Sequence, residues 1–271
     1  MTIQPKEYPS AEESTTRAPS KGASEKTILV LEAALSNERF TDITEETGLT
    51  KTTVHRILST LVDQNFISGD ARGGYRPGPR FLALAGRALD SIDISSLAQP
   101  FVDELVANVD CTVHVGVASG DEIVYVIRTD SSKPYRMRSR VGLSLPMHSS
   151  GIGKVVLAGR PDQEILRLAE RTGLPARTKA TITEPEKLLE DIRATRARGY
   201  ALDLGENEDG TVCVSAPIYD HTNRVTHGLS ISSIALEHPA RTIETLAPAA
   251  MATAAKISRH LGANVEQTQG R

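Results

Sequence analysis

The segment between residues 40 and 65 constrains this chain most, because it has the pattern of two short helices joined by a tight turn. It reads FTDITEETGLTKTTVHRILSTLVDQN. Helical patterns over residues 41–47 and 51–64 are separated by Gly48-Leu49-Thr50, and a short turn with glycine is typical of a helix-turn-helix unit. In the second pattern, apolar residues recur at helical spacing and predict one buried face. They are Val54, Ile57, Leu58, Leu61 and Val62.

The opposite face of this second helix is polar, and it is basic at its N-terminal end. A recognition helix meets base edges and phosphates with that end. We therefore predict that this face binds double-stranded DNA. The residues that we expect to take part are Thr41, Lys51, Thr52, Thr53, His55 and Arg56. An ordinary helical hairpin with a solvated face is the alternative interpretation.

A helix before this segment and a hairpin after it extend the unit over residues 24–79. Ser24 has the position of an N-cap for a helix over residues 25–37. The stretch FISGDARGGYRP then combines an apolar pair, a glycine-rich turn and a return strand, which predicts a two-stranded wing. Arg72 and Arg76 on this wing are placed to hold phosphates or to enter a minor groove. A solvated hairpin tip explains either arginine equally well.

An apolar stripe follows the wing, in a segment that we predict to be a linker helix over residues 80–96. The stripe consists of Phe81, Leu82, Ala85, Leu89 and Ile92. It has two interpretations, which are docking on its own domain and pairing with a second copy of the chain. We favour pairing, because a dimer reads two half-sites and gains specificity that one short helix cannot supply.

Charge and cysteine content narrow the class of protein. A net charge of -3 excludes a chain covered in basic charge, so DNA contact depends on a local patch. Cys111 and Cys213 are far apart and belong to no CxxC or Cys/His cluster, which argues against a disulfide framework or a zinc site. No apolar run approaches the roughly 18 residues of a membrane span, and the N-terminus lacks a signal-peptide pattern. We expect a cytoplasmic protein with no cofactor and no membrane contact.

Residues 97–262 change from a helical to a mixed pattern, and they predict an antiparallel sheet with flanking helices in a chain of the α+β class. Residues 1–23 read as a disordered arm and residues 263–271 as a flexible tail. Strands are predicted over residues 112–118, 122–128, 137–145, 212–218 and 225–234. Helices are predicted over residues 97–109, from about 150, over 161–172, from a cap at Thr183 to Gly199, and over 241–261 with a kink at Pro248.

The sequence GIGK at residues 151–154 invites a phosphate-loop interpretation, which fails. The Walker pattern requires a glycine and a Ser or Thr at the positions held here by His148 and Val155. What remains is a helix start at Ser150, Gly151 and Ile152, where unpaired N–H groups and the helix dipole favour an anion such as a carboxylate. A close-packed glycine turn without a ligand is the alternative.

Four more residues are candidates for the same site. Ser230 and Ser232 are two apart on one predicted strand and so share a face, Cys213 lies on the strand before it, and Asp203 precedes both. Small polar groups of this kind are more often satisfied core groups than ligand contacts. As a catalytic set they lack a GxSxG elbow, an HExxH motif or a Cys/His pair with supporting spacing, so we expect no enzyme activity.

Five segments in order resemble the IclR family of bacterial transcription regulators. They are TGLTKTTVHRILSTLVDQNFI, YRPGPRFLALA, LPMHSSGIGKVVLA, RGYALDLGENEDGTVCVSAPIYD and the C-terminal ISRHLG, and the resemblance as a whole covers residues 25–262. The resemblance implies a winged helix-turn-helix, a linker helix and an effector-binding domain of GAF-like architecture. It also implies a homodimer or homotetramer on a palindromic operator, near genes for the catabolism of small acids or aromatic compounds.

The resemblance also assigns a ligand site. It implies that backbone amides at Gly151 and Ile152 hold the ligand beside Ser150, that Asp203, Cys213, Ser230 and Ser232 complete the cavity, and that Leu145 and Met147 form an apolar wall. The chain has Ser149-Ser150 where many members carry Ala-Thr or Ala-Ser, and Leu204-Gly205 where acidic residues are common. These departures change the rim of the cavity.

The sequence therefore predicts a repressor of a catabolic operon that responds to a carboxylate or aromatic acid. Two rival functions remain. One is an enzyme with a DNA-binding appendage, which turnover of a ligand would reveal. The other is an adaptor whose winged helix binds another protein, which sequence-specific binding to promoter DNA would exclude.

Overall fold

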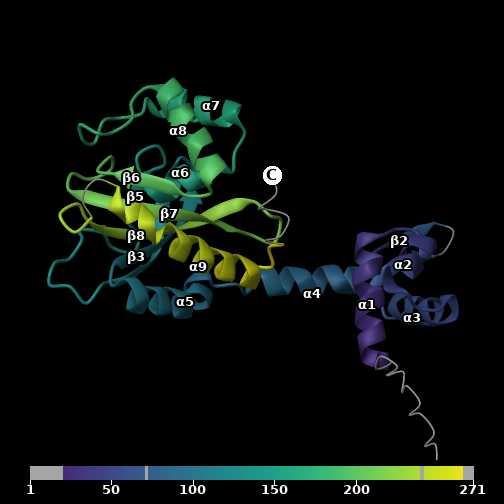
Figure 1. Ribbon diagram of the computed structural model, residues 1–271. Coiled ribbons are helices and arrows are strands. Elements are labelled where there is room, and N and C mark those ends of the chain that lie inside the picture. Colours follow the sequence, from purple (N-terminus) through teal and green to yellow (C-terminus); the bar gives the residue numbers. More distant parts are fainter. Residues whose placement is uncertain (1–20, 71–72, 239–240, 265–271) are drawn as a thin grey trace, which may run out of the picture. The chain divides into compact units, whose positions relative to one another are not determined.

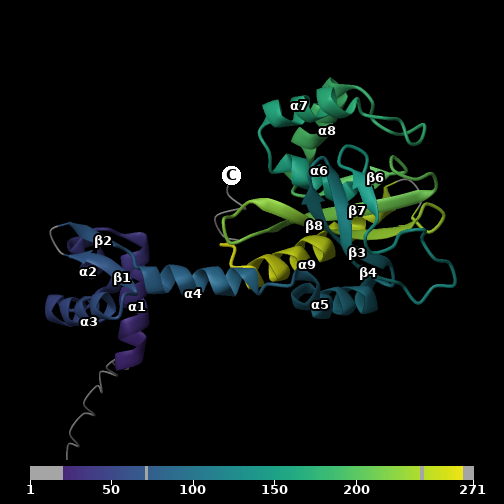
Figure 2. The same cartoon turned by 180° about the vertical axis from the view of Figure 1, so that it is seen from behind.

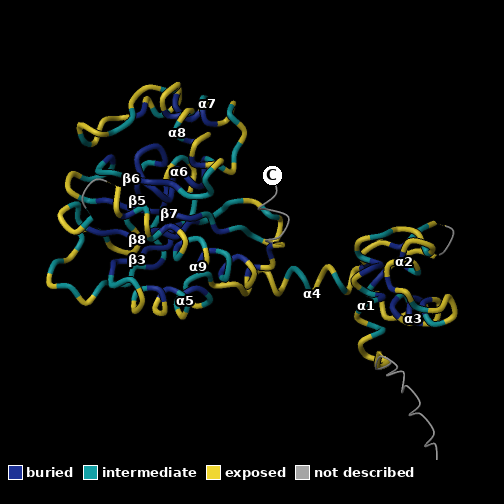
Figure 3. The backbone as a smooth tube through the Cα atoms, in the orientation of Figure 1, coloured by how far each residue is buried: buried dark blue, intermediate teal, exposed yellow. Residues whose placement is uncertain are grey.

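The computed structural model describes residues 21–70, 73–238 and 241–264, which divide into two compact units between Ile92 and Asp93 (Figure 1). Most of the predicted arm over residues 1–23 and of the predicted tail over residues 263–271 lies outside this description. Each unit has its own buried apolar core, which Figure 3 shows as dark blue segments.

The first unit is a three-helix bundle with a two-stranded wing, as predicted. Its elements are α1 (Ala23–Ser36), α2 (Phe40–Thr47), α3 (Lys51–Asp63), β1 (Ile67–Asp70), β2 (Gly74–Pro77) and α4 (Pro79–Asp90). The turn between α2 and α3 begins at Gly48, whose φ of 64° lies in the left-handed region that glycine adopts at little cost. Thr50 then caps α3. The prediction that Ser24 caps α1 is wrong, because the helix begins two residues earlier than predicted and Gly22 is its N-cap residue.

The predicted linker helix over residues 80–96 is interrupted. Helix α4 ends at Asp90, and a new helix, α5 (Ile94–Val109), begins after Asp93, whose carboxylate accepts a hydrogen bond from the backbone N–H of Ser95 at 3.0 Å. This N-cap starts α5. No residue of α4 is buried within the chain, and Leu82 and Leu89 on its apolar stripe are 58% and 42% exposed.

The second unit is a six-stranded antiparallel sheet between two layers of helices (Figure 2). The strand order is β5-β4-β3-β8-β7-β6. The strands are β3 (Thr112–Ser119), β4 (Glu122–Thr129), β5 (Ser144–Pro146), β6 (Ala201–Leu204), β7 (Thr211–Tyr219) and β8 (Val225–Ile234). Helices α5 and α9 (Ala247–His260) pack on one face; α6 (Gly151–Ala158), α7 (Asp162–Thr172) and α8 (Pro185–Arg198) lie over the other.

Two strand predictions differ from the structure. The strand predicted over residues 137–145 is reduced to the short edge strand β5, because polar contacts hold the preceding residues as a loop: Arg128 donates to Asp130 and to the carbonyl of Met137. Strand β6 was not predicted, since its four residues are too short to show a period. It forms the opposite edge of the sheet and carries Asp203 into the fold.

Two helix predictions also need correction. Thr183 does not cap α8, because Glu184 is the N-cap residue and Pro185 opens the first turn. Pro248 does not kink a helix over residues 241–261. Instead a short 3-10 helix (Thr242–Leu246) precedes α9, and Pro248 lies in the first turn of α9, where its missing N–H costs nothing.

Two glycines let α6 approach the centre of the sheet. Gly116 on β3 and Gly228 on β8 are paired across the ladder. A Cβ atom on Gly228 would lie 2.9 Å from side-chain atoms of Ile152 and Val155, and one on Gly116 would lie 3.3 Å from Ile152. The absence of both side chains therefore sets the start of α6 close against the two central strands.

Among the described helices, none has the length and apolar character that crossing a bilayer requires.

Candidate functional site

The predicted DNA-reading face is the solvent side of α3. Lys51, Thr52, His55 and Arg56 are exposed, while Val54, Ile57, Leu58 and Leu61 are buried against the rest of the unit. Thr53 is half-buried, and its hydroxyl lies 2.9 Å from that of Thr50 in the N-terminal cap. Thr41 is exposed and donates a hydrogen bond to Asp42. The geometry leaves a polar and basic face free for a partner, and its role in DNA binding stays a prediction.

The two predicted wing arginines differ in what the structure says of them. Arg72 lies outside the described residues. Arg76 is 69% exposed, and its Nε atom lies 4.0 Å from a carboxylate oxygen of Glu38, so an exposed and weak ion pair is available to it. Its charge remains accessible to solvent.

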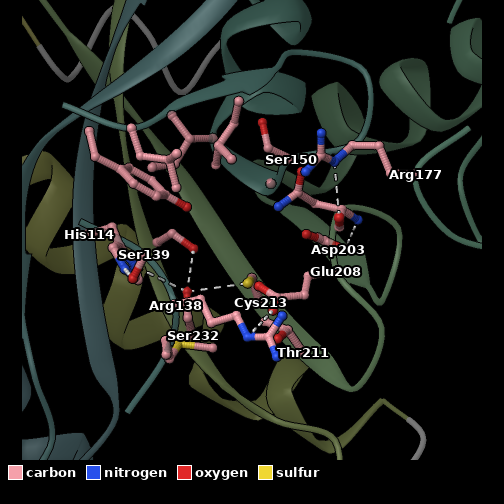
Figure 4. A pocket seen from close by; sticks show the side chains of 18 of the residues that line it. His114, Arg138, Ser139, Ser150, Arg177, Asp203, Glu208, Thr211, Cys213 and Ser232 are labelled. Atoms are coloured by element: carbon pink, nitrogen blue, oxygen red, sulfur yellow. Dashed lines mark hydrogen bonds and ion pairs between the residues drawn. The ribbon is translucent and has the colours of Figure 1, made fainter. Parts of the chain in front are cut away.

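A cavity of about 450 Å³ opens in the second unit, between the start of α6 and one end of the central strands (Figure 4). Eight of the nine residues predicted for the effector site line it: Leu145, Ser150, Gly151, Ile152, Asp203, Cys213, Ser230 and Ser232. Met147 does not. It is 1% exposed and packs in the core under α6, with its backbone against Gly153.

The start of α6, where the sequence predicts an anion site, lies on one side of the cavity. Ser150 caps the helix, because its hydroxyl accepts from the N–H of Gly153 at 3.2 Å and donates to the carbonyl of Pro146 at 2.8 Å. The N–H groups of the first turn have no acceptor within their own helix and lie at the positive end of its dipole. A Cβ atom on Gly151 would lie 2.4 Å from the hydroxyl oxygen of Ser215, so only glycine permits this close packing.

A continuous hydrogen-bonded chain forms the opposite side. The thiol of Cys213 donates to the hydroxyl of Ser232 at 3.2 Å, which also lies 3.3 Å from that of Ser230 and 3.2 Å from Nδ1 of His114. Nε2 of His114 lies 2.8 Å from the hydroxyl of Ser139. Figure 4 shows His114, Ser139, Cys213 and Ser232, which come from β3, the loop before β5, β7 and β8, close to one another. Each hydroxyl can rotate to donate or accept, so the surface can adapt to a polar ligand.

Burial keeps His114 neutral. Its side chain is removed from water and stacks on Tyr125, with ring centroids 4.5 Å apart. This burial, together with the nearby charge of Arg128, lowers the pKa of His114 to about 3. A neutral imidazole offers one donor and one acceptor, which matches the two hydroxyls that it contacts.

Asp203 places a carboxylate in the same cavity as the first turn of α6. Its Oδ1 atom accepts from the backbone N–H groups of Glu206 at 2.7 Å and Asn207 at 3.3 Å. Burial raises the pKa of Asp203 to about 6, although the positive charge of Lys154 and the two N–H donors oppose this shift. The group therefore exchanges a proton more easily near neutral pH than an ordinary aspartate does.

Several residues that line the cavity were not predicted from the sequence. Met137, Arg138, Arg140 and Leu143 come from the loop that we had predicted as a strand; Arg177 and Thr178 come from the segment between α7 and α8; Asn207, Glu208, Asp209 and Thr211 come from the segment between β6 and β7. Figure 4 labels Arg177 and Glu208 among the side chains that line the cavity. Nothing local in the sequence distinguishes these side chains from ordinary loop residues.

The cavity lacks the features of a cysteine active site. Burial raises the pKa of the Cys213 thiol, so the thiol stays protonated, and its hydrogen-bond partner is a hydroxyl. A nucleophilic cysteine needs the opposite, a lowered pKa and an adjacent base. Within residues 21–70, 73–238 and 241–264, no group of three His, Cys, Asp or Glu side chains is arranged to hold a metal ion.

Known protein families match both units. The model for the C-terminal domain of the bacterial transcriptional regulator IclR matches residues 86–259, and the model for the IclR helix-turn-helix domain matches residues 26–71. Together the two matches cover most of the chain.

Individual proteins similar to this chain are also transcriptional regulators. The chain is 32% identical over 216 residues to the HTH-type transcriptional regulator KipR of Bacillus subtilis, covering 80% of this chain and 86% of KipR. It is 35% identical over 197 residues to the HTH-type transcriptional regulator XynR of Escherichia coli, and the match covers 72% of this chain and 78% of XynR. The crystal structure of the Agobacterium tumefaciens repressor BlcR superimposes with a TM-score of 0.70 at 26% identity, covering 89% of this chain and 97% of BlcR. These relatives are named as regulators rather than enzymes.

Proposed function

This chain belongs to the IclR family of bacterial transcriptional regulators, and from that membership we propose that it is a repressor whose binding to DNA is controlled by a small organic acid. Members of the family bind DNA through the helix-turn-helix domain and an effector through the C-terminal domain. The observation that carries the proposal is the cavity itself, which joins an anion site to a buried hydrogen-bonding surface and contains no activated nucleophile.

The anion site defines the class of effector. A carboxylate at the first turn of α6 would accept hydrogen bonds from the N–H groups of Gly151 and Ile152 without any rearrangement of the backbone. The rest of the molecule would lie between the apolar side chains of Leu145 and Ile152 and the polar chain through Ser232. A cavity of about 450 Å³ accommodates a short aliphatic acid or a single aromatic ring with a carboxylate.

The reading face supports the DNA half of the proposal. Lys51 and Arg56 would contact phosphates or base edges, and Thr52 and His55 would supply further hydrogen bonds. We propose that two copies, or a pair of dimers, read a palindromic operator of a catabolic operon in the cytoplasm. The exposed apolar stripe of α4, with Leu82 58% exposed, supports such pairing.

A ligand screen followed by a DNA-binding assay tests this function. We expect at least one member of a panel of aliphatic and aromatic carboxylates to raise the melting temperature, because a ligand that binds only the folded chain stabilises it. The same acid should weaken binding to a fragment from the promoter of the regulated operon.

Matched serine variants connect that response to the cavity. Ser232→Ala removes a hydroxyl from the cavity wall and should abolish the response, while leaving DNA binding without ligand unchanged. Ser233→Ala is the control, because Ser233 is equally buried but its hydroxyl contacts Tyr135 and Glu237 instead. A full response in the Ser232→Ala protein would remove this surface from the effector site.

A further inference from the structure

Lys154, the lysine of the GIGK sequence, is a charged residue buried in the core of the second unit. It is 1% exposed and is one of the largest fully buried side chains of the described chain. Its ammonium group donates to the carbonyl of Leu202 on β6 at 2.9 Å and to a carboxylate oxygen of Glu206 at 2.5 Å. It also lies 2.9 Å from a carboxylate oxygen of Asp191 on α8. One side chain of α6 thus connects three separate elements.

Stability alone does not explain this cluster. Removing charges from water costs free energy that their mutual attraction often fails to return, so apolar side chains of similar size commonly serve a core as well or better. The cost is visible in this cluster, since burial raises the pKa of Glu206 to about 7 in spite of the adjacent ammonium group. A role in arranging the polar groups around it is the more economical explanation.

The segment that Lys154 holds is part of the cavity wall. Residues 203–209 contain Asp203, Asn207 and Glu208, which all line the cavity. Glu206 links Lys154 to Asp203. Its side-chain carboxylate accepts a hydrogen bond from Lys154, and its backbone N–H donates one to the carboxylate of Asp203. The position of the Asp203 carboxylate therefore depends on the contact between Lys154 and Glu206.

The same segment is held from its outer side. The hydroxyl of Thr178 donates to the carbonyl of Gly205 at 2.7 Å, and the hydroxyl of Thr181 donates to the carbonyl of Glu206 at 2.6 Å. Both threonines lie between α7 and α8, and Asp191 on α8 shares the ammonium group of Lys154. The segment is fixed between α6 and the α7–α8 layer, directly beside the first turn of α6.

We propose that Lys154 is a positioning residue of the effector site: it holds residues 203–209 against α6 and α8 and so sets the distance between Asp203 and the anion site. This inference rests on the proposed effector function. Lys154 does not touch the cavity itself, since it is absent from its lining, and it acts through Glu206 and Asp203.

The test compares three variants of the full-length chain by NMR, with acetate as the probe. In the wild type, acetate should shift the backbone amide signals of Gly151 and Ile152. Lys154→Met should weaken acetate binding by about tenfold, the equivalent of one well-formed hydrogen bond. It should also move the amide signals of Glu206 and Asn207 in the absence of acetate. Lys187→Met is the matched control, because Lys187 has an ion pair of 2.6 Å with Glu184 that is exposed and away from the cavity.

A double variant separates positioning from stability. Lys154→Met leaves the buried carboxylate of Glu206 without its cation and takes one of two cations from the half-buried carboxylate of Asp191, so it will destabilise the unit. Lys154→Met/Glu206→Gln removes one of those charges, and Asp191 keeps Arg198 as a partner at 3.8 Å. We expect the double variant to regain most of the lost urea midpoint while acetate binding remains weak.

The outcomes are distinct. Acetate binding that returns with stability in the double variant would overturn the positioning role, as would a Lys154→Met protein that binds acetate like the wild type. If acetate shifts no amide of α6 in the wild type, the proposed effector site itself is wrong and the inference falls with it.

Discussion

Protonation of His114 offers a quantitative test of the cavity. Because burial and Arg128 lower its pKa to about 3, the imidazole stays neutral in the folded chain at pH values where it is charged in the unfolded chain. The unfolded chain then binds more protons, so this group lowers stability as pH falls below about 6.5. Between pH 7.5 and 5.5 the linkage relation gives a loss of about 1.4 kcal/mol from this residue alone.

The two cysteines allow unfolding of the second unit, which contains His114, to be measured separately. Cys111 and Cys213 are the only cysteines, and both are buried in the second unit. Their reaction with 4,4′-dithiodipyridine, measured against urea concentration at pH 7.5 and pH 5.5, reports the free energy of unfolding of that unit.

A variant isolates the contribution of His114. His114→Asn keeps an amide near the position of Nδ1, within reach of Ser232, and cannot titrate. Burial also lowers the pKa of His148, His227 and His238, so the wild type and the variant share those contributions. The loss of stability between the two pH values should be about 1.4 kcal/mol smaller in the variant. An equal loss in both proteins would refute a neutral, buried His114.

Three further predictions concern DNA binding, packing and assembly. Arg56→Ala should weaken operator binding and reduce the slope of log affinity against log salt by about 1, whereas Arg193→Ala in the second unit should leave the slope unchanged; equal slopes for wild type and Arg56→Ala would remove that phosphate contact. Gly153→Ala should destabilise the second unit by about 3 kcal/mol in urea unfolding, since its Cβ atom would lie 2.3 Å from backbone atoms of Met147. A loss below about 1 kcal/mol would contradict the close packing. Leu89→Glu should reduce the mass measured by light scattering to that of a monomer, while Arg87→Glu, on another face of α4, should not.

The elements that were predicted correctly are those with local signals. The buried stripe through Val54 and Leu61 has the helical period, and Gly48 identifies the turn, so α3 could be placed from its own residues. The same holds for the start of α6 at Ser150, where a cap precedes an apolar run. In both places one short segment contains all the information that determines its structure.

The parts that were missed depend on contacts between distant segments. His114 belongs to the cavity because β3 pairs with β8 in a register that sets it opposite Ser230, and this pairing has no signature within either strand. Nothing near Lys154 in the sequence distinguishes it from an ordinary helical lysine, because its partner Glu206 lies 52 positions later in the chain. The family resemblance placed Met147 in the cavity wall, but its side chain is buried in the core beside α6.

The central claim is that occupancy of the cavity controls DNA binding, and one titration tests it most directly. The dissociation constant for a promoter fragment should be measured by fluorescence anisotropy at fixed salt, with and without a saturating carboxylate that raises the melting temperature. We predict that the acid weakens DNA binding by about 5- to 150-fold, and that DNA weakens binding of the acid by the same factor. An acid that binds the cavity and leaves the affinity for DNA unchanged would contradict the account.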